Sequence, residues 1–138
     1  MRGPLTQVLV HIVWATWDRL PLIVPNIEDR LVACLADEAR GLRCSPMAIG
    51  GMADHVHVLI AIHPTVAVAR LVQQLKGVSS HLINHELDSP AGFKWQGAYG
   101  AFSVSPDAAP FVARYIALQK QHHAKGTLHL EWETMEEW

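Results

Sequence analysis

The 138-residue sequence has little of several features that mark common protein classes. Its only two cysteines, Cys34 and Cys44, form no CxxC pair, which argues against a disulfide framework or a cysteine-rich zinc site. Its apolar runs, such as residues 56–62, are far shorter than the roughly 20 residues that span a bilayer. The N-terminus lacks the apolar core of a signal peptide. We therefore expect a cytoplasmic protein with reduced thiols and no membrane partner.

The sequence also has no large excess of positive or negative charge, because the formal net charge is −2 with the histidines neutral. This value argues against a protein that holds nucleic acid through a bulk positive field alone. Four acids lie in residues 131–138, and removing these four changes the net charge from −2 to +2. Hydrophobic residues make up 50% of the chain, which predicts one packed domain over residues 1–138 with a short acidic tail at about 126–138. Nine histidines are many for this length and direct attention to metal or proton chemistry.

Hydrophobic periodicity and turn residues predict four strands and three helices. The strands are expected at residues 6–15, 44–52, 55–62 and 98–104, and the helices at residues 27–40, at about 65–86 and, after a start signature at 105–107, up to about 123. Asn26 and Thr65 are the expected N-caps of the first two helices. Residues 50–51 are a candidate bulge and residues 53–54 a candidate hairpin turn. This order predicts an α+β, ferredoxin-like fold of the split β-α-β type. It would have an antiparallel sheet, helices on one face and a C-terminal helix in addition.

His55 and His57 form the first candidate site. Residues i and i+2 of a strand point to the same face, so the two imidazoles would stand side by side, as two ligands of one metal ion do. With nine histidines, such a pair also arises from composition alone. The structural alternative is two buried imidazoles that are satisfied by hydrogen bonds.

Tyr115 and Gln119 form the second candidate site. At positions i and i+4 of a helix they would share one face, so a phenol nucleophile would lie beside an amide oxygen that can bind a metal. The alternative is an amphipathic helix with a surface tyrosine and a solvated glutamine. His122 and His123 lie one turn further on, and adjacent helix positions point apart, so both together are poor ligands.

A third group of residues has the chemistry of a surface that binds nucleic acid. Aromatic residues beside a cation, as in the segment 94–102, can stack the bases of a single strand, whereas the alternative is an aromatic packing cluster at the sheet edge. Lys76, Ser79 and Ser80 can contact phosphates, and the alternative is a solvated helix end.

Five segments, taken in order, resemble the single-tyrosine transposases of the HUH superfamily, which include the REP-associated tyrosine transposases. These segments are His11-Ile-Val-Trp-Ala-Thr16, Gly51-Met-Ala-Asp-His-Val-His-Val-Leu-Ile60, Leu75-Lys-Gly-Val-Ser-Ser80, residues 95–105 and residues 115–123. The resemblance implies that His55 and His57 bind a divalent cation, Mg²⁺ or Mn²⁺. It implies that Gln119 is the third ligand and that Tyr115 is the catalytic tyrosine. Family members are typically homodimers in which the tyrosine helix can serve the partner's site.

The resemblance implies an enzyme that cleaves and rejoins single-stranded DNA beside hairpins through a 5′-phosphotyrosine. Two other hypotheses stay open: a domesticated hairpin-DNA-binding protein without transposition activity, and a metal-dependent nuclease on the same fold. Trp17-Asp18 stands where many relatives carry a basic residue, so DNA contacts there are not carried over. The candidate DNA-binding residues are Arg19, Lys76, Ser79, Ser80, Lys94, Trp95, Arg114 and Lys120.

Overall fold

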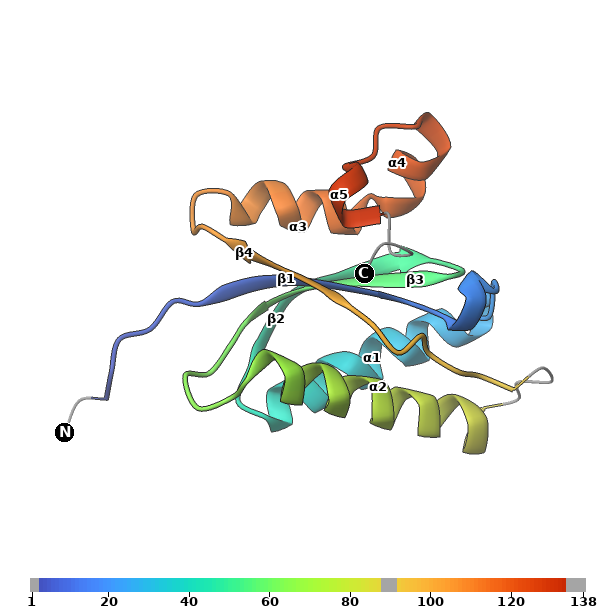
Figure 1. The fold of residues 1–138 in the computed structure, drawn as a ribbon, viewed down its shortest axis with the longest axis horizontal. Helices are drawn as coiled ribbons and strands as arrows, with labels where there is room; N and C mark the ends of the chain where they lie inside the picture. Colours follow the sequence, from blue (N-terminus) through green and yellow to red (C-terminus); the bar gives the residue numbers. More distant parts are fainter. Residues whose placement is uncertain (1–2, 88–91, 134–138) are drawn as a thin grey trace.

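The computed structural model describes residues 3–87 and 92–133, which form a four-stranded antiparallel sheet between two layers of helices (Figure 1). Helices α1 and α2 cover one face, and α3, α4 and α5 cover the other. The elements are β1 (Leu9–Ala15), η1 (Trp17–Arg19), α1 (Pro25–Gly41), β2 (Ser45–Met52), β3 (His55–Ala61), α2 (Val68–His85), β4 (Gly100–Val104), α3 (Ala109–Ala117), α4 (Gln119–Lys125) and α5 (Leu130–Glu133). The predicted α+β class and the antiparallel sheet are therefore confirmed. No helix of the described part has both the length and the apolar character needed to cross a membrane.

The strand order β2-β3-β1-β4 places β1 and β3 in the interior of the sheet. Every residue of β1 is buried, which agrees with its nearly continuous run of apolar residues, because both faces of an interior strand are covered. In the antiparallel register, Val13 pairs with His57 and Ala15 pairs with His55. The histidine pair therefore lies at the end of the sheet where β1 finishes and β3 begins.

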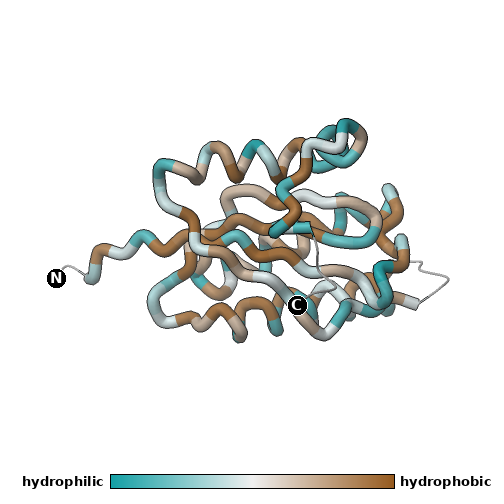
Figure 2. Tube along the Cα trace, turned by 45° about the horizontal axis from the view of Figure 1, so that its top comes forward, coloured by the Kyte–Doolittle hydropathy of each residue, from teal (hydrophilic) through white to brown (hydrophobic). Residues whose placement is uncertain are grey.

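Side chains of β3 alternate between the two helix layers. Val56, Val58 and Ile60 belong to the main core under α1 and α2, whereas Leu59 packs in the smaller cluster under α3. Figure 2 shows that hydrophobic residues, coloured brown, are frequent along the strands in the middle of the molecule. The odd positions of β3 share the face of Leu59, so His55 points toward the α3–α5 layer. The alternation of the strand thus aims the imidazoles at the layer that carries the C-terminal helices.

Helix starts differ from the sequence expectation. Helix α1 begins at Pro25 after Val24, and α2 begins at Val68 after Ala67, so neither Asn26 nor Thr65 is the N-cap. Proline at the first helical position is preorganised by its fixed φ and needs no amide partner, which explains the earlier start of α1. Helix α3 begins at Ala109, later than the signature at residues 105–107 suggests.

The C-terminal helical region also differs from the prediction of one helix up to about residue 123. Leu118 adopts φ −105° and ψ 25°, and this residue separates α3 from α4. A further short helix, α5, follows at residues 130–133 within the predicted acidic tail. The remainder of that tail, residues 134–138, lies outside the described residues.

The β2–β3 hairpin confirms the turn at residues 53–54 but not the bulge at residues 50–51. The register shift lies between Pro46 and Ala48 instead. Gly50 has a different role, because a Cβ atom there would lie 2.5 Å from the carbonyl oxygen of Ile116. The glycine therefore lets the helix that carries Tyr115 approach the sheet closely.

Candidate functional site

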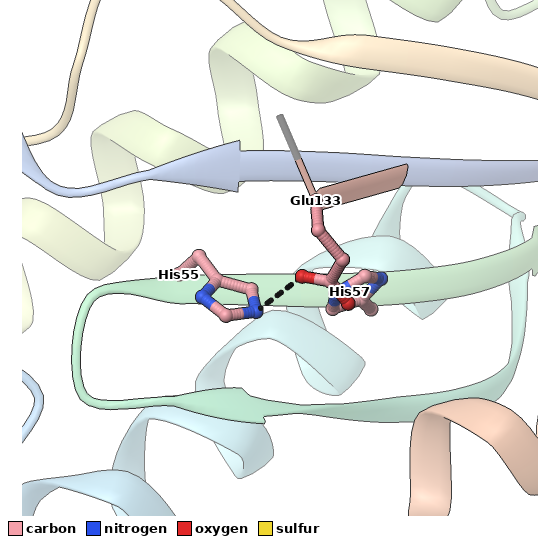
Figure 3. Close-up of side chains that lie close together, drawn as sticks. All are labelled: His55, His57 and Glu133. Carbon is pink, nitrogen blue, oxygen red and sulfur yellow. Dashed lines mark ion pairs between the residues drawn. The ribbon is translucent and has the colours of Figure 1, made fainter. Parts of the chain in front are cut away.

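His55 and His57 lie side by side on β3, with ring centroids 5.1 Å apart, and both are fully buried. Figure 3 shows that Glu133, at the end of α5, reaches between them. Its Oε2 lies 3.1 Å from Nε2 of His55, and its Oε1 lies 3.2 Å from Nε2 of His57. One donor atom from each of the three residues falls within 4.8 Å of the others. The three side chains therefore converge on one point.

Two outer partners fix the orientation of the imidazoles. Oδ1 of Asp54 lies 2.7 Å from Nδ1 of His55, and Nε2 of His11 lies 2.8 Å from Nδ1 of His57. Asp54 is held in turn by Nε of Arg19 at 3.2 Å. In both rings Nδ1 contacts its outer partner, so Nε2 is the nitrogen that faces the point on which His55, His57 and Glu133 converge. This is the arrangement in which second-layer hydrogen bonds orient metal-binding histidines.

The buried ionisable groups of the cluster shift one another's pKa values. Burial disfavours a charged His55, but the nearby Asp54 and Glu133 carboxylates raise its pKa to about 9. Burial lowers the pKa of His57, and it lowers the pKa of His11 to about 3 with help from His57. Burial alone would raise the pKa of Glu133, but the two imidazoles hold it well below its usual range. The Asp54 and Glu133 carboxylates therefore face His55 from its two sides, and Arg19 offsets the charge of Asp54.

Several buried polar atoms of the cluster have no hydrogen-bond partner among the described residues. They are Nδ1 of His11, Nε2 of His57, Oε2 of Glu133 and the side-chain nitrogen of Gln119. The imidazole–carboxylate contacts around Glu133 are close but are not all oriented as hydrogen bonds. Buried polar groups are normally paired, so these atoms call for a further partner at the centre. A cation that accepts lone pairs from Nε2 of His57 and Oε2 of Glu133 meets this requirement for these two atoms.

Tyr115 is buried against the same cluster. Its hydroxyl donates to Oε1 of Glu133 at 2.7 Å and accepts the backbone N–H of His129 at 3.1 Å. Its ring lies 5.9 Å from that of His57 and stacks on His122 at 4.7 Å. Burial, reinforced by the Glu133 carboxylate, raises the pKa of Tyr115 to about 12. The phenol is therefore protonated in this state.

Gln119 reaches the cluster from the first residue of α4. Its Oε1 lies 3.2 Å from Nε2 of His55 and 3.1 Å from Nε2 of His123. Although the helix breaks between Tyr115 and Gln119, both side chains still face the imidazoles. The structure thus brings together, within one chain, the four residues that the sequence placed at the metal and nucleophile positions. His122 and His123 contact different groups, in line with the expectation that they point apart.

Three members of the cluster were not singled out from the sequence. Glu133 lies in an acidic tail without any periodic pattern, so no local signal placed it at the site. Asp54 and His11 both lie within the segments that carry the family resemblance. His11 lies on β1, which pairs with the strand that carries His55 and His57. Its contact with His57 depends on the register of that pairing, which the sequence alone did not give.

Some candidate DNA-binding residues are internal in this structure. Ser79 and Trp95 are both buried, and the indole Nε1 of Trp95 donates to the Ser79 hydroxyl at 2.9 Å. The ammonium of Lys76 donates to the carbonyl oxygens of Gln96 and Ala98 at 2.7 and 2.8 Å, and burial lowers its pKa to about 8. The packing alternative therefore describes Ser79 and Trp95, because buried side chains are not presented to a ligand. Lys76 holds the segment that precedes β4.

The other candidates are closer to solvent. Lys94 and Arg114 are exposed, and Ser80 is half-buried. Exposed Lys120 forms an ion pair with Glu28 at 2.5 Å. Arg19 is half-buried and also donates to the backbone oxygen of Glu133 at 3.0 Å. These positions are compatible with contacts to an external ligand.

Comparisons with known proteins show which family this chain is similar to. A family model described as "Transposase IS200 like" matches residues 5–119. The ISDra2 transposase TnpA of Deinococcus radiodurans is 30% identical over 125 residues, which cover 86% of this chain and 88% of that protein. A crystal structure assigned as a transposase from Deinococcus radiodurans has a TM-score of 0.64 and 28% identity, covering 86% of this chain and 95% of that one.

A second solved structure, of a REP-associated tyrosine transposase bound to a REP hairpin, has a TM-score of 0.67. It covers 89% of this chain and 72% of that one, but at 11% identity it supports the fold alone. Residue 133 lies beyond the part of the chain that the family model matches. The contribution of Glu133 to the cluster is therefore an observation on this chain.

Proposed function

Because the chain belongs to the IS200-like transposase family, among the HUH tyrosine transposases, we propose that it cleaves and rejoins single-stranded DNA beside a hairpin through Tyr115. Membership of the family implies DNA strand transfer. The single observation that carries the finer proposal is the position of the Tyr115 hydroxyl, which meets the same carboxylate that bridges His55 and His57. A hydrolase that uses an activated water has no need of a phenol at this place. The hairpin is proposed by analogy with the structural neighbour that binds one.

We propose that His55, His57 and Gln119 bind a divalent cation, Mg²⁺ or Mn²⁺, and that Glu133 contributes a further oxygen. The convergence of His55, His57 and Glu133 on one point and the unpartnered Nε2 of His57 and Oε2 of Glu133 support this set, and the amide oxygen of Gln119 lies 3.2 Å from Nε2 of His55. Oxygen donors of this kind suit hard divalent cations. When bound, such a cation draws electron density from a phosphate oxygen and stabilises the departing 3′-oxygen.

Tyr115 is the proposed nucleophile. Its oxygen attacks the phosphorus atom, a bond between that oxygen and phosphorus forms, and the bond from phosphorus to the 3′-oxygen breaks. The phenolic proton, which hydrogen-bonds to Oε1 of Glu133 in this structure, leaves as the new bond forms, and the departing 3′-oxygen gains a proton, so the step as a whole is proton-neutral. The new ester conserves the energy of the broken bond, so a second 3′-hydroxyl can reverse the step.

The raised pKa of Tyr115 sets a requirement for this step. Burial and the nearby carboxylate favour the neutral phenol, so the negative charge of Glu133 must be offset before the phenolate becomes accessible. A cation bound by His55 and His57 would provide that offset. The proposed cation and the proposed nucleophile are therefore coupled through Glu133.

The test is an adduct assay. A labelled DNA hairpin with single-stranded flanks is incubated with the protein and Mg²⁺ or Mn²⁺, and a denaturation-resistant protein–DNA adduct is expected. Tyr115→Phe should abolish the adduct and spare binding, whereas Tyr99→Phe, which changes the only other tyrosine, should retain it. An adduct that persists in Tyr115→Phe would contradict the assignment. Affinity without cleavage would favour the binding protein, and free 5′-phosphates without an adduct would favour the nuclease.

The ligand set has its own test, which is calorimetric titration with Mn²⁺. His55→Ala should abolish binding, and Gln119→Ala and Glu133→Gln should each weaken it by at least about ten-fold. Exposed Lys125→Gln on the same helix as Gln119 is the control and should bind normally. Unchanged affinity in Glu133→Gln would remove Glu133 from the set. The homodimer and the cytoplasmic location remain predictions, and sedimentation of the purified protein tests the first.

A further inference from the structure

Two segments meet at the end of the sheet next to the histidine pair. The backbone N–H of Trp17 donates to the carbonyl of Lys94 at 2.9 Å, and Thr16 forms an isolated β-bridge with Trp95. The pairing brings the ammonium of Lys94 to 3.9 Å from the ring centroid of Trp17. The Trp17 side chain is nevertheless 50% exposed. A half-exposed indole and a cation are therefore presented together at the surface.

The backbone holds this pair in a fixed position. The Asn84 side chain both donates to the carbonyl and accepts the N–H of Phe93, at 2.8 and 2.7 Å. On the other side, Asp18 and Arg19 adopt φ values of 54° and 51°, a left-handed conformation that is unfavourable for residues other than glycine. Consecutive residues keep such a conformation only where the surroundings enforce it, and this happens most often at functional sites.

A hollow of about 360 Å³ opens beside the indole. Its walls are mainly apolar and aromatic, with one cation and one amide at the rim, and they include Trp17, Leu20, Leu22, Asn84, Phe93 and Lys94. Leu20 is 45% exposed, so the apolar surface continues beyond the ring. A flat apolar face with an adjacent cation matches a nucleobase and its phosphate, because bases stack on aromatic rings irrespective of sequence.

The surface around Trp17 lies close in the fold to the histidine cluster, which favours DNA as its ligand. Thr16, next to Trp17, donates its backbone N–H to the carbonyl of Asp54 at 2.9 Å, and Asp54 contacts Nδ1 of His55. The Arg19 side chain from the same turn also contacts Asp54. The segment that carries Trp17 is therefore linked through Thr16 and Arg19 to the residue that orients His55, so a DNA strand that reaches the histidine cluster around this end of the sheet would pass Trp17.

We propose that Trp17 and Lys94 form a base platform, in which the indole stacks one unpaired base of the strand entering the Tyr115 site and the ammonium pairs with an adjacent phosphate. The platform rests on the proposed function, because it assumes that single-stranded DNA occupies the site. It adds a contact for an unpaired nucleotide at a fixed distance from the scissile phosphate. A protein partner on the same surface would give a different outcome in the test below.

The probe is a DNA hairpin with oligothymidine flanks, in which single abasic sites are placed at successive flank positions. Binding is measured with Tyr115→Phe protein, so that cleavage does not interfere. At one flank position the abasic site should weaken binding on the order of ten-fold, as expected for loss of one stacked base. Trp17→Leu should weaken binding of the intact probe by a similar factor and remove the abasic penalty at that position, whereas Trp17→Phe should retain most of both.

Matched controls separate the platform from general effects. Met47→Ala alters a side chain of equal exposure (49%) on β2, toward the opposite end of the sheet, and should leave affinity unchanged. Lys94→Gln should weaken DNA binding and lower the salt dependence of the affinity by the equivalent of about one phosphate contact. The control Arg70→Gln changes an exposed residue at the far end of α2 from Asn84 and should leave both quantities unchanged.

The outcomes separate the two proposals. If wild-type protein forms the Tyr115 adduct but Trp17→Leu keeps full affinity, or keeps an unchanged abasic pattern, the platform is refuted and the proposed function stands. If the wild-type protein neither binds the probe nor forms an adduct with it, both are overturned.

Discussion

Gly50→Ala is the substitution that most sharply tests how the nucleophile is positioned. A Cβ atom at residue 50 would lie 2.5 Å from the carbonyl oxygen and 3.3 Å from the carbonyl carbon of Ile116, the residue that follows Tyr115. Both contacts are with the helix backbone, so no side-chain rotation relieves them. Because real Cβ atoms essentially never approach another heavy atom closer than 3.0 Å, α3 must move from β2 by at least about 0.5 Å.

The displacement has two expected consequences. Overpacking of this kind lowers the free energy of unfolding by roughly 1–3 kcal/mol. Moving Tyr115 relative to the imidazoles of β3 should slow adduct formation on the order of ten- to a hundred-fold, because reacting groups tolerate very little misplacement. The first quantity is measured by urea unfolding and the second by single-turnover adduct formation at saturating DNA and Mn²⁺.

Gly77→Ala is the matched control for Gly50→Ala. Gly77 lies within α2, and a Cβ atom there meets nothing within 4 Å. Alanine in this helix should raise stability by about 0.5–1 kcal/mol and leave the adduct rate unchanged. If Gly50→Ala behaved like Gly77→Ala in both assays, the helix that carries Tyr115 would not be seated on its own sheet as described.

Three further predictions follow from the same contacts. Mixing His55→Ala with Tyr115→Phe should not restore adduct formation, since Tyr115 lies against the histidines of its own chain; recovery would show that subunits exchange the tyrosine helix. Asp54→Asn should weaken Mn²⁺ binding by about 10- to 100-fold in calorimetry while circular dichroism stays unchanged, because it loosens the His55 ring, and normal affinity would argue against that role. Lys76→Gln should lower unfolding stability by roughly 1–3 kcal/mol, because two backbone carbonyls lose a charged donor; an unchanged urea midpoint would show that solvent satisfies them equally well.

The sequence predicted those parts of the structure that depend on local periodicity. Alternation along β3 places His55 and His57 on one face whatever the rest of the chain does. The order of strands and helices follows from short apolar runs and turn residues, and it correctly predicted the antiparallel sheet. The helix starts were less accurate, because Pro25 begins α1 without the side-chain cap that Asn26 suggested.

The features that the sequence did not predict depend on contacts between segments that are far apart in the chain. Glu133 reaches the histidines only because α4 and α5 fold back over the sheet, and its own segment has no pattern that reports this. Ser79 and Trp95 have residue types that suit a DNA surface, but a hydroxyl that donates to a carbonyl within its helix and accepts an indole N–H is fully satisfied inside the protein. Trp17 and Lys94 become neighbours only through the bridge between two loops.

Mass spectrometry of the protein–DNA adduct tests the central claim most directly. After nuclease and protease digestion, the account predicts that the peptide containing Tyr115 carries the mass of a 5′-linked nucleotide, and that the peptide containing Tyr99 carries none. A nucleotide on Tyr99 or on any residue other than Tyr115, or a cleaved strand with no modified peptide, would contradict it.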